Sequence, residues 1–328
     1  MYVLSHPPTI RTQGPSPEWT VRQAGYNKTG VSYTGGNYGS RLGQSYLRSR
    51  SATLAHAIEG HFGEAGGRDI LEIGCGTGLT LESLGQRSGH RLVGMDFSST
   101  MLREAGARTA TSPNPATLLL GNAIELPFED ASFDAIYATR FIHQFPHVDK
   151  LRIAAEIERV LRPGGLVALE FYARTINRIR YHLDQHHKYA TRELYFSHYP
   201  SSEEVREIVG PDFRVRALRY FGDRLVNRVL GYQAFSFGEA LVTRFPLARW
   251  LMSEHWVFYT PRGKQGELAA ARKDAPADAL AMMRCPSCRG PLSREATQRI
   301  LACGSCRRAY ALEDGVPNLL SHEARPLA

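Results

Sequence analysis

The sequence predicts an α/β fold with a mostly parallel sheet, helices on both of its faces, and a small cysteine-rich module near the C-terminus. Short apolar runs alternate with amphipathic segments between residues 69 and 261, and four of the five cysteines form two CxxC pairs. Such alternation favours parallel strands joined by right-handed crossovers. With 328 residues, the chain can form one domain of roughly 200 to 250 residues and a smaller module.

Seven apolar segments have the length and composition expected of strands. Amphipathic segments with the periodicity of a helix lie between several of them. The expected strands are DILEIG (69–74), RLVGMD (91–96), TLLLGNA (117–123), FDAIYAT (133–139), LVALEFY (166–172), FRVRALRYFG (213–222) and HWVFYTP (255–261). The expected helices are TLESLGQR (80–87), SSTMLREAGAR (98–108) and DKLRIAAEIERVL (149–161).

The composition divides the chain into four parts. Residues 1–45 are expected to form a polar tail and a mobile lid. Residues 46–263 hold the predicted sheet, with a His-, Arg- and Tyr-rich insertion at 174–210 on the substrate side. Residues 264–282 are rich in Ala and charged side chains, which is typical of a linker, and residues 283–321 form the cysteine module.

The charge balance favours anionic partners without identifying one. The 40 Lys and Arg residues exceed the 32 Asp and Glu residues, which gives a net charge of +8. The Arg residues are scattered along the chain, so a general basic composition is favoured over a nucleic-acid face. No run of about 18 apolar residues and no signal peptide is visible. We therefore expect a cytoplasmic protein without a membrane partner, with its CxxC pairs reduced and metal-bound.

One expected strand continues into a glycine-rich loop that contains Gly74, Gly76 and Gly78. Glycine at alternate positions lets the backbone turn tightly and approach a ligand, at the edge where open α/β sheets bind nucleotides. Asp96 follows Gly78 by 18 positions, at the end of the next apolar run. Because an acidic side chain there can accept hydrogen bonds from both ribose hydroxyls, the sequence predicts a site for a nucleoside without a 2′-phosphate.

Four motifs follow one another in a distinctive order: EIGCGTG at 72–78, DFS at 96–98, GNA at 121–123 before LPFEDASFD, and LRPGG at 161–165. This order resembles class I S-adenosylmethionine-dependent methyltransferases, and most closely the ubiquinone/menaquinone C-methyltransferase type, over roughly residues 46–262. The resemblance implies a Rossmann-like, doubly wound sheet of seven strands. A dehydrogenase fits less well, because its dinucleotide loop is GxGxxG and LRPGG has no role in it.

The resemblance also implies how S-adenosylmethionine is bound and S-adenosylhomocysteine released. The glycine loop passes under the methionine part, Asp96 holds the ribose, Phe97 and Met101 flank the adenine, and position 122 faces its amino group. Many relatives have Asp at that position, and Asn still offers an acceptor. The implied cofactor-binding residues are Glu72, Gly74, Cys75, Gly76, Gly78, Asp96, Phe97, Met101, Asn122 and Ala123, with Cys75 a small loop residue rather than a reactive thiol.

The methyl group of a sulfonium is electrophilic, so the protein must hold the acceptor in line and accept its proton where it has one. His143 follows the fourth strand, where relatives often carry a histidine near the transferred methyl, and Glu170 ends the fifth strand. Both are candidate catalytic bases, and a structural or substrate-packing role is the alternative for His143.

The lid and the insertion are rich in side chains that suit an anionic or aromatic substrate. An ordinary surface segment and a solvated helix face are the alternatives, and the HxxxHH spacing in the insertion has no acidic neighbours that would favour a metal site. The candidate substrate residues are Tyr26, Tyr33, Tyr38, Arg41, Arg178, Arg180, Tyr181, His186 and Tyr195.

The two CxxC pairs, Cys285 with Cys288 and Cys303 with Cys306, are separated by 14 residues. Each turn directs two thiolates at one centre, and two turns complete a tetrahedral zinc site. Since the protein fills all four positions, a structural Zn²⁺ is favoured over a redox dithiol. Loss of the metal is expected to unfold this zinc ribbon and to leave cofactor binding largely intact.

The wider segment from CPSCRGPL to DGVPNLL resembles the small zinc-ribbon protein that activates tRNA, rRNA and release-factor methyltransferases in trans. Here the segment is fused in cis, so the resemblance implies intramolecular docking on the methyltransferase domain. RNA binding by the ribbon is the alternative, and a homodimer stays open.

The sequence favours methyl transfer to a small, anionic or aromatic metabolite by direct in-line displacement. The alternative is an RNA or protein methyltransferase that binds its substrate through the ribbon. Against it, the segment ATRFIHQF lacks the Asn/Asp-Pro-Pro-Tyr loop used to methylate amino groups of bases and glutamine. A non-catalytic partner of another methyltransferase is disfavoured because the cofactor motifs are intact.

Overall fold

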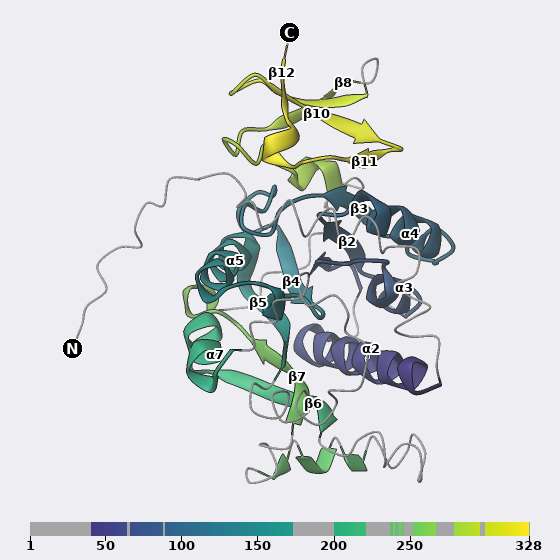
Figure 1. Cartoon of the computed structure of the whole chain (residues 1–328), viewed down its shortest axis with the longest axis vertical. Helices are drawn as coiled ribbons and strands as arrows, with labels where there is room; N and C mark the ends of the chain where they lie inside the picture. Colours follow the sequence, from purple (N-terminus) through teal and green to yellow (C-terminus); the bar gives the residue numbers. More distant parts are fainter. Residues whose placement is uncertain are drawn as a thin grey trace, which may run out of the picture.

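The structure is a computed structural model. It describes residues 41–63, 66–87, 89–172, 200–220, 237–238, 240–242, 244–245, 252–266, 279–295 and 299–327. In these ranges a layered α/β domain carries a small β-rich module beyond one edge of its sheet (Figure 1). No helix among the described residues has both the length and the apolar character needed to cross a membrane.

The larger sheet has seven strands in the order β3-β2-β1-β4-β5-β7-β6. Strands β1 to β5 pair in parallel, and β7 runs antiparallel to both β5 and β6. This arrangement confirms the predicted doubly wound, mostly parallel sheet. The strands are β1 (Asp69–Ile73), β2 (Arg91–Asp96), β3 (Thr117–Leu120), β4 (Phe133–Ala138), β5 (Leu161–Tyr172), β6 (Phe213–Tyr220) and β7 (Met252–Tyr259).

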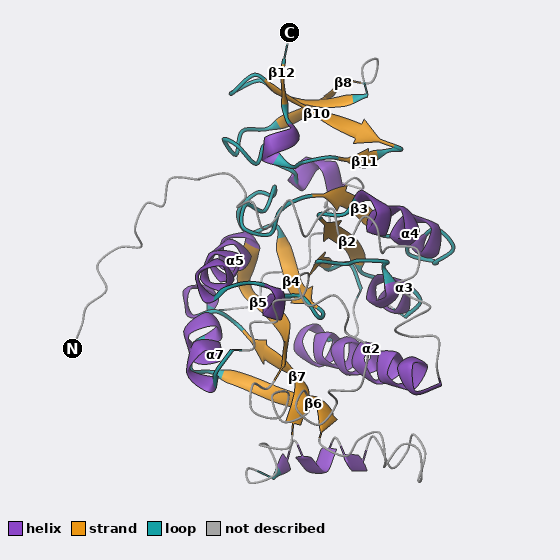
Figure 2. Ribbon diagram, viewed as in Figure 1, coloured by secondary structure: helices purple, strands orange, loops and turns teal. Residues whose placement is uncertain are grey.

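Helices pack on both faces of the sheet, and each face has its own apolar core (Figure 2). On one face the core contains side chains of α2, α3 and α4, and on the other it contains side chains of α5 and α7. The bounds are α2 (Arg41–Phe62), α3 (Leu79–Gly85), α4 (Ser99–Thr109), α5 (His147–Val160) and α7 (Ser202–Val209).

Serine caps fix two of the helix starts. The hydroxyl of Ser98 accepts a hydrogen bond from the backbone N–H of Met101, and Ser201 forms a reciprocal capping box with Glu204 at the start of α7. Such caps satisfy backbone donors that a helix leaves without an intrahelical partner. The cap at Ser98 matters for function, because it begins α4 directly after Asp96.

The sequence predicts a helix over 149–161 and a strand over 166–172, so that most of the LRPGG motif would lie between them, but the structure differs. Helix α5 ends at Val160, and Leu161 is already extended, so the motif forms the first part of β5. The pairing with β4 shifts register between Phe133 and Ala135. A side chain at Gly165 would approach the carbonyl oxygen of Asp134 to 2.8 Å, so the glycine permits close contact of the two strands.

Buried charges tie four strands together at their amino ends. Arg162 donates to Asp134 at 2.7 Å and to Asp69 at 2.9 Å, and all three side chains are buried. Asp69 also pairs with Arg91, and Asp134 with Arg68. This network lies at the end of the sheet opposite the glycine loop, so its contribution is to stability.

The C-terminal module is a small antiparallel sheet of β8 (Leu292–Glu295), β9 (Ile300–Cys303), β10 (Arg308–Glu313), β11 (Val316–Pro317) and β12 (Arg325–Pro326). The short helix η4 (Ala279–Met282) precedes it, within the segment expected to be a linker, and its Met282 is buried.

The module contacts the segment 120–129, which leads from β3 to β4. The backbone N–H of Leu319 donates to the carbonyl oxygen of Leu120 at 2.8 Å, and Arg284 donates in the same way to Pro127 at 2.9 Å. Arg289 also forms an ion pair with Glu156 of α5 at 3.0 Å. The module therefore lies beside the edge strand β3 and forms hydrogen bonds with the segment that follows it.

Candidate cofactor site and metal centre

The carboxyl ends of β1 and β4 meet at the point where the strand order reverses, which is where open α/β sheets bind ligands. The glycine loop follows β1 there. Gly74 has a φ of +70°, and a Cβ at this position would collide with the ring of Phe141. The backbone N–H groups of Gly74 and Cys75 both donate to the carbonyl oxygen of Met95, which ties the loop to β2.

Glu72 supports this loop from inside the sheet. Its carboxylate accepts hydrogen bonds from the hydroxyls of Tyr137 and Thr139, each at 3.0 Å. Burial raises the pKa of Glu72 to about 8, although these hydrogen bonds oppose the shift. The side chain therefore joins β1 to the end of β4 and does not line the cavity itself.

Asp96 lies at the end of β2 with its carboxylate buried. Its Oδ2 accepts from the backbone N–H of Gly76, and its Oδ1 accepts from that of Ser98, both at 2.9 Å. Burial raises the pKa of Asp96 to about 6, and the backbone hydrogen bonds oppose this rise. An acceptor thus stands between the glycine loop and the start of α4.

A cavity at this point brings together many of the residues implied by sequence. Gly74, Cys75, Gly76, Asp96, Phe97 and Met101 line it, whereas Glu72, Gly78, Asn122 and Ala123 lie outside the lining. Asn122 is buried, and its Oδ1 accepts from the backbone N–H of Ile124 at 3.2 Å. The lining residues that the sequence did not indicate are Arg50, Thr77, Leu79, Thr80, Thr139, Arg140, Phe141 and Gln144.

Neither candidate base is among the residues that line this cavity. His143 is in the short helix η1 (Ile142–Gln144) after β4, buried, with its ring 4.4 Å from that of Tyr172. Glu170 is fully buried near the end of β5, where it accepts from the hydroxyl of Tyr46 and from the backbone N–H of Arg140.

Most candidate substrate residues lie outside the described residues. This applies to Tyr26, Tyr33, Tyr38, Arg178, Arg180, Tyr181, His186 and Tyr195. Arg41 is the first residue of α2, and only its backbone is described.

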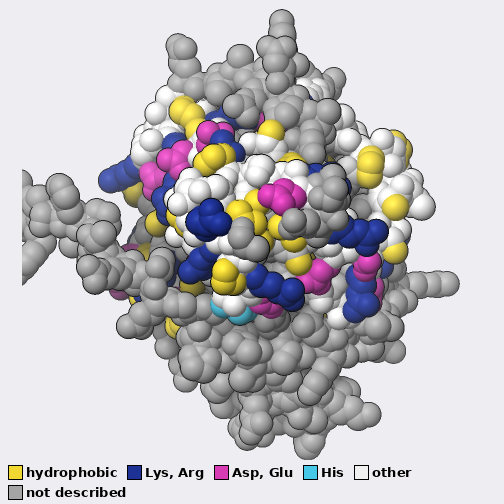
Figure 3. Space-filling model, turned by 90° about the horizontal axis from the view of Figure 1, so that it is seen from above, with side chains coloured by type: hydrophobic (Ala, Val, Ile, Leu, Met, Phe, Trp, Pro, Cys, Tyr) yellow, Lys and Arg dark blue, Asp and Glu magenta, His cyan; other side chains and the backbone are white. Residues whose placement is uncertain are grey.

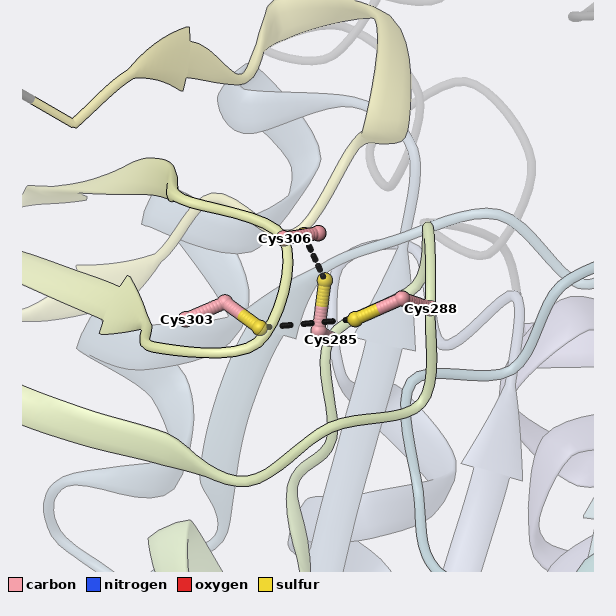
Figure 4. Close-up of side chains that lie close together, drawn as sticks. All are labelled: Cys285, Cys288, Cys303 and Cys306. Carbon is pink, nitrogen blue, oxygen red and sulfur yellow. Dashed lines mark hydrogen bonds between the residues drawn. The ribbon is translucent and has the colours of Figure 1, made fainter.

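The four cysteines of the C-terminal module converge on one point (Figure 4). Their Sγ atoms all lie within 4.8 Å of one another, with Cys285 and Cys306 3.5 Å apart and Cys288 and Cys303 3.4 Å apart. Four thiolates bound tetrahedrally at 2.3 Å would lie roughly 3.8 Å apart, so the cluster fits a zinc ion. The Tyr310 hydroxyl lies 3.1 Å from the Sγ of Cys285, where it can orient that ligand.

Two family models match this chain. Residues 71–169 match a methyltransferase domain, and residues 278–315 match the Trm112p-like protein.

The matches to curated relatives cover about a third of this chain. An O-methyltransferase of Aspergillus sclerotiorum is 34% identical over 119 residues, which cover 35% of this chain and 44% of the relative. A demethylmenaquinone methyltransferase of Symbiobacterium thermophilum is 42% identical over 106 residues, which cover 30% and 40%. The chain thus spans about half the length, or less, of these relatives.

Among solved structures, the magnesium protoporphyrin IX methyltransferase of Synechocystis with bound SAH is similar with a TM-score of 0.51. The match covers 73% of this chain and 98% of that one at 14% identity, so the likeness concerns the fold. Together with the strand order, it shows that the larger domain has the fold of that methyltransferase. More particularly, a segment that matches a methyltransferase domain is followed in this chain by a segment that matches the Trm112p-like protein.

Proposed function

We propose that the protein transfers the methyl group of S-adenosylmethionine to a small, anionic or aromatic metabolite by direct in-line displacement. The observation that carries this proposal is the cavity in which the glycine loop, Asp96, Phe97 and Met101 meet. Asp96 would accept hydrogen bonds from the ribose hydroxyls, and the two apolar side chains would flank the adenine. The sulfonium supplies the electrophilic methyl group, so the chain has to orient the acceptor and keep water away.

His143 is our candidate for the group that takes a proton from the acceptor. It follows β4 on the side of the sheet where the cavity opens, and it packs edge-on against Tyr172. A placed base contributes roughly 10²- to 10⁴-fold to such a transfer. The lid and the 174–210 insertion, with their Arg, Tyr and His residues, would enclose a compact anion and exclude solvent.

Methylation of RNA or protein is the second candidate, because the C-terminal domain is Trm112p-like and the chain is basic. Viewed from the ribbon end, however, Lys and Arg side chains are interspersed with Asp and Glu on the visible described surface (Figure 3). An RNA-binding face usually presents a continuous positive patch. The described residues of this face therefore do not favour an RNA substrate.

The ribbon, in this proposal, docks on its own methyltransferase domain and supports the cofactor site. Its contacts bracket the segment that carries Asn122: Leu319 bonds to Leu120 on one side, and Met283 pairs with Phe128 on the other. Zinc would act by folding the ribbon and not by contacting the substrate. Because its four thiolates require a reducing environment, we place the protein in the cytoplasm.

Two measurements test the proposed activity together. S-adenosylmethionine carrying a labelled methyl group is incubated with a metabolite extract and, separately, with total tRNA and rRNA, and RNA binding is titrated across salt. Label in a small acidic or aromatic product supports the proposal. His143→Ala should reduce that label, while His147→Ala, a partly exposed control at the start of α5, should not. Salt-sensitive RNA binding at sub-micromolar concentration, with label in RNA, would establish the second candidate instead.

A further inference from the structure

Helix α2 brings a guanidinium group into the wall of the cofactor cavity. Arg50 is 3% exposed and lines the same cavity as Asp96 and Phe97. Its Nη2 lies 3.4 Å from the hydroxyl of Thr80, and its Nη1 lies 3.6 Å from Oε2 of Glu170. Arg50 thus reaches from a helix before β1 into a site built by the loops after β1, β2 and β4.

Glu170 holds this arrangement together. Its Oε1 accepts from the hydroxyl of Tyr46 at 3.0 Å, and its Oε2 accepts from the backbone N–H of Arg140 at 3.1 Å. The Arg50 guanidinium also lies 5.4 Å from the centre of the Tyr46 ring. Both carboxylate oxygens of Glu170 are therefore engaged by α2 and by the loop after β4, and the side chain is fully buried.

The charges in the cavity wall are polarised. Its charged lining residues are Asp96, Arg50 and Arg140. Asp96 ends β2, whereas Arg140 follows β4 and Arg50 pairs with Glu170 of β5, and β1 lies between β2 and β4 in the sheet. Arg140 is partly exposed, whereas Arg50 is buried and aimed by Glu170. A ligand with hydroxyls at one end and a carboxylate at the other matches this order, because a guanidinium fork suits a carboxylate.

We infer that Arg50 binds the carboxylate of the amino-acid end of the cofactor, and that Glu170 and Tyr46 are positioning residues which aim Arg50. The inference rests on the cofactor binding proposed above. It gives Glu170 a different task from that of a proton acceptor, since both of its oxygens are engaged by other groups of the protein and its side chain does not line the cavity. It also makes docking of α2 a condition for tight cofactor binding.

The test compares two ligands by calorimetry on the full-length, zinc-loaded protein. S-adenosylhomocysteine carries the amino-acid end, and 5′-methylthioadenosine has the same nucleoside and a thioether without it. Arg50→Met should weaken S-adenosylhomocysteine binding roughly 10- to 100-fold, because a charged hydrogen-bonding partner is lost. Binding of 5′-methylthioadenosine should stay within about twofold. Arg48 is an exposed neighbour on α2, and Arg48→Met is the matched control, which should change the affinity for neither ligand.

Glu170→Gln and Tyr46→Phe should weaken S-adenosylhomocysteine in the same selective way, by a smaller factor. Retained 5′-methylthioadenosine binding shows that each variant is folded. Equal losses for both ligands, or an unchanged affinity for S-adenosylhomocysteine in Arg50→Met, would overturn the inference. If the unmodified protein bound neither ligand, the proposed function itself would fail. If Asp96→Ala weakened the binding of S-adenosylhomocysteine and Arg50→Met did not, only the role of Arg50 would be rejected.

Discussion

Asp96 accepts a hydrogen bond from the backbone N–H of Gly76 at 2.9 Å, and thereby links the end of β2 to the glycine loop that follows β1. The same buried carboxylate, with its pKa raised to about 6, is our candidate for the acceptor of hydrogen bonds from the ribose hydroxyls. Cofactor binding, loop geometry and proton binding are therefore coupled at one side chain.

The first prediction concerns pH. Since burial raises the pKa of Asp96 above its usual value, the folded protein favours the protonated acid, and this group costs stability as pH rises from about 4 to 6. The ionised form accepts hydroxyl hydrogen bonds better, so cofactor affinity should fall as pH drops below about 6, by up to tenfold per pH unit. Calorimetry from pH 5 to 8 measures this.

Two variants give that measurement its controls. Asp96→Asn should remove the change near pH 6, while any dependence near pH 8 from Glu72 stays. Asp96→Ala should cost about 1–3 kcal/mol of cofactor binding. If the change in cofactor affinity near pH 6 persisted in Asp96→Asn, a group other than Asp96 would be responsible for it.

The second prediction is one zinc ion per chain, held by the four clustered cysteines. Cys303→Ser should lose the metal, because a tetrahedral site with three thiolates binds zinc far more weakly. Elemental analysis of protein purified without chelator is the measurement. Cys75→Ser, a change at the cysteine outside the cluster, should retain the metal, and a zinc-free unmodified protein would remove the proposed metal centre.

The third prediction separates docking of the ribbon from its folding. Met283 is 1% exposed and pairs with Phe128 at the seam, so Met283→Asp should detach the ribbon while zinc stays bound. Because the segment with Asn122 then loses its support, cofactor affinity should fall about fivefold or more, a loss of roughly 1 kcal/mol, comparable to one hydrogen bond. From sequence alone we expected unfolding of the ribbon to leave cofactor binding largely intact; the contacts of segment 120–129 lead to the opposite expectation.

The control for docking is Arg325→Asp, which introduces the same acidic group on the exposed strand β12. It should leave both zinc content and cofactor affinity unchanged. Unchanged cofactor affinity in Met283→Asp, with a ribbon shown by hydrogen exchange to be detached, would mean that docking does not support the cofactor site.

The fourth prediction concerns stability. Arg162→Met would leave the buried carboxylates of Asp69 and Asp134 without their shared partner, which should cost about 3–5 kcal/mol. Urea unfolding measures this loss, and the exposed Arg214→Met on β6 is the control. Cofactor affinity of the folded protein should stay the same, since the network lies at the opposite ends of the strands.

The order of the strands along the chain, and the glycine loop and Asp96 of the cofactor site, could be predicted because they depend on local signals. Strands alternate with helices along the chain, and Gly74 and Asp96 each end a strand, so parallel pairing alone brings them to one edge. Arg50 carries no such signal. It lies in an amphipathic helix before the first strand, and only tertiary packing onto β5 reveals that it reaches the cavity.

The start of β5 and the residues through which the ribbon contacts the larger domain escaped prediction for a related reason. Proline and two glycines usually end a helix, but pairing with Phe133 draws Leu161 into the sheet at once. The seam joins Leu120 to Asn318, almost two hundred positions later, and no periodicity within either segment specifies such a partner.

The position of the ribbon beside β3 has a further consequence for self-association. Strand β3 is the edge of the larger sheet and consists of Thr117 followed by three leucines, a sequence prone to pair with the same strand of another molecule. The ribbon covers its carboxyl end through Leu319, and fusion in one chain supplies this cover at every protein concentration. A chain truncated before residue 279 should therefore aggregate through β3, even where its fold is intact.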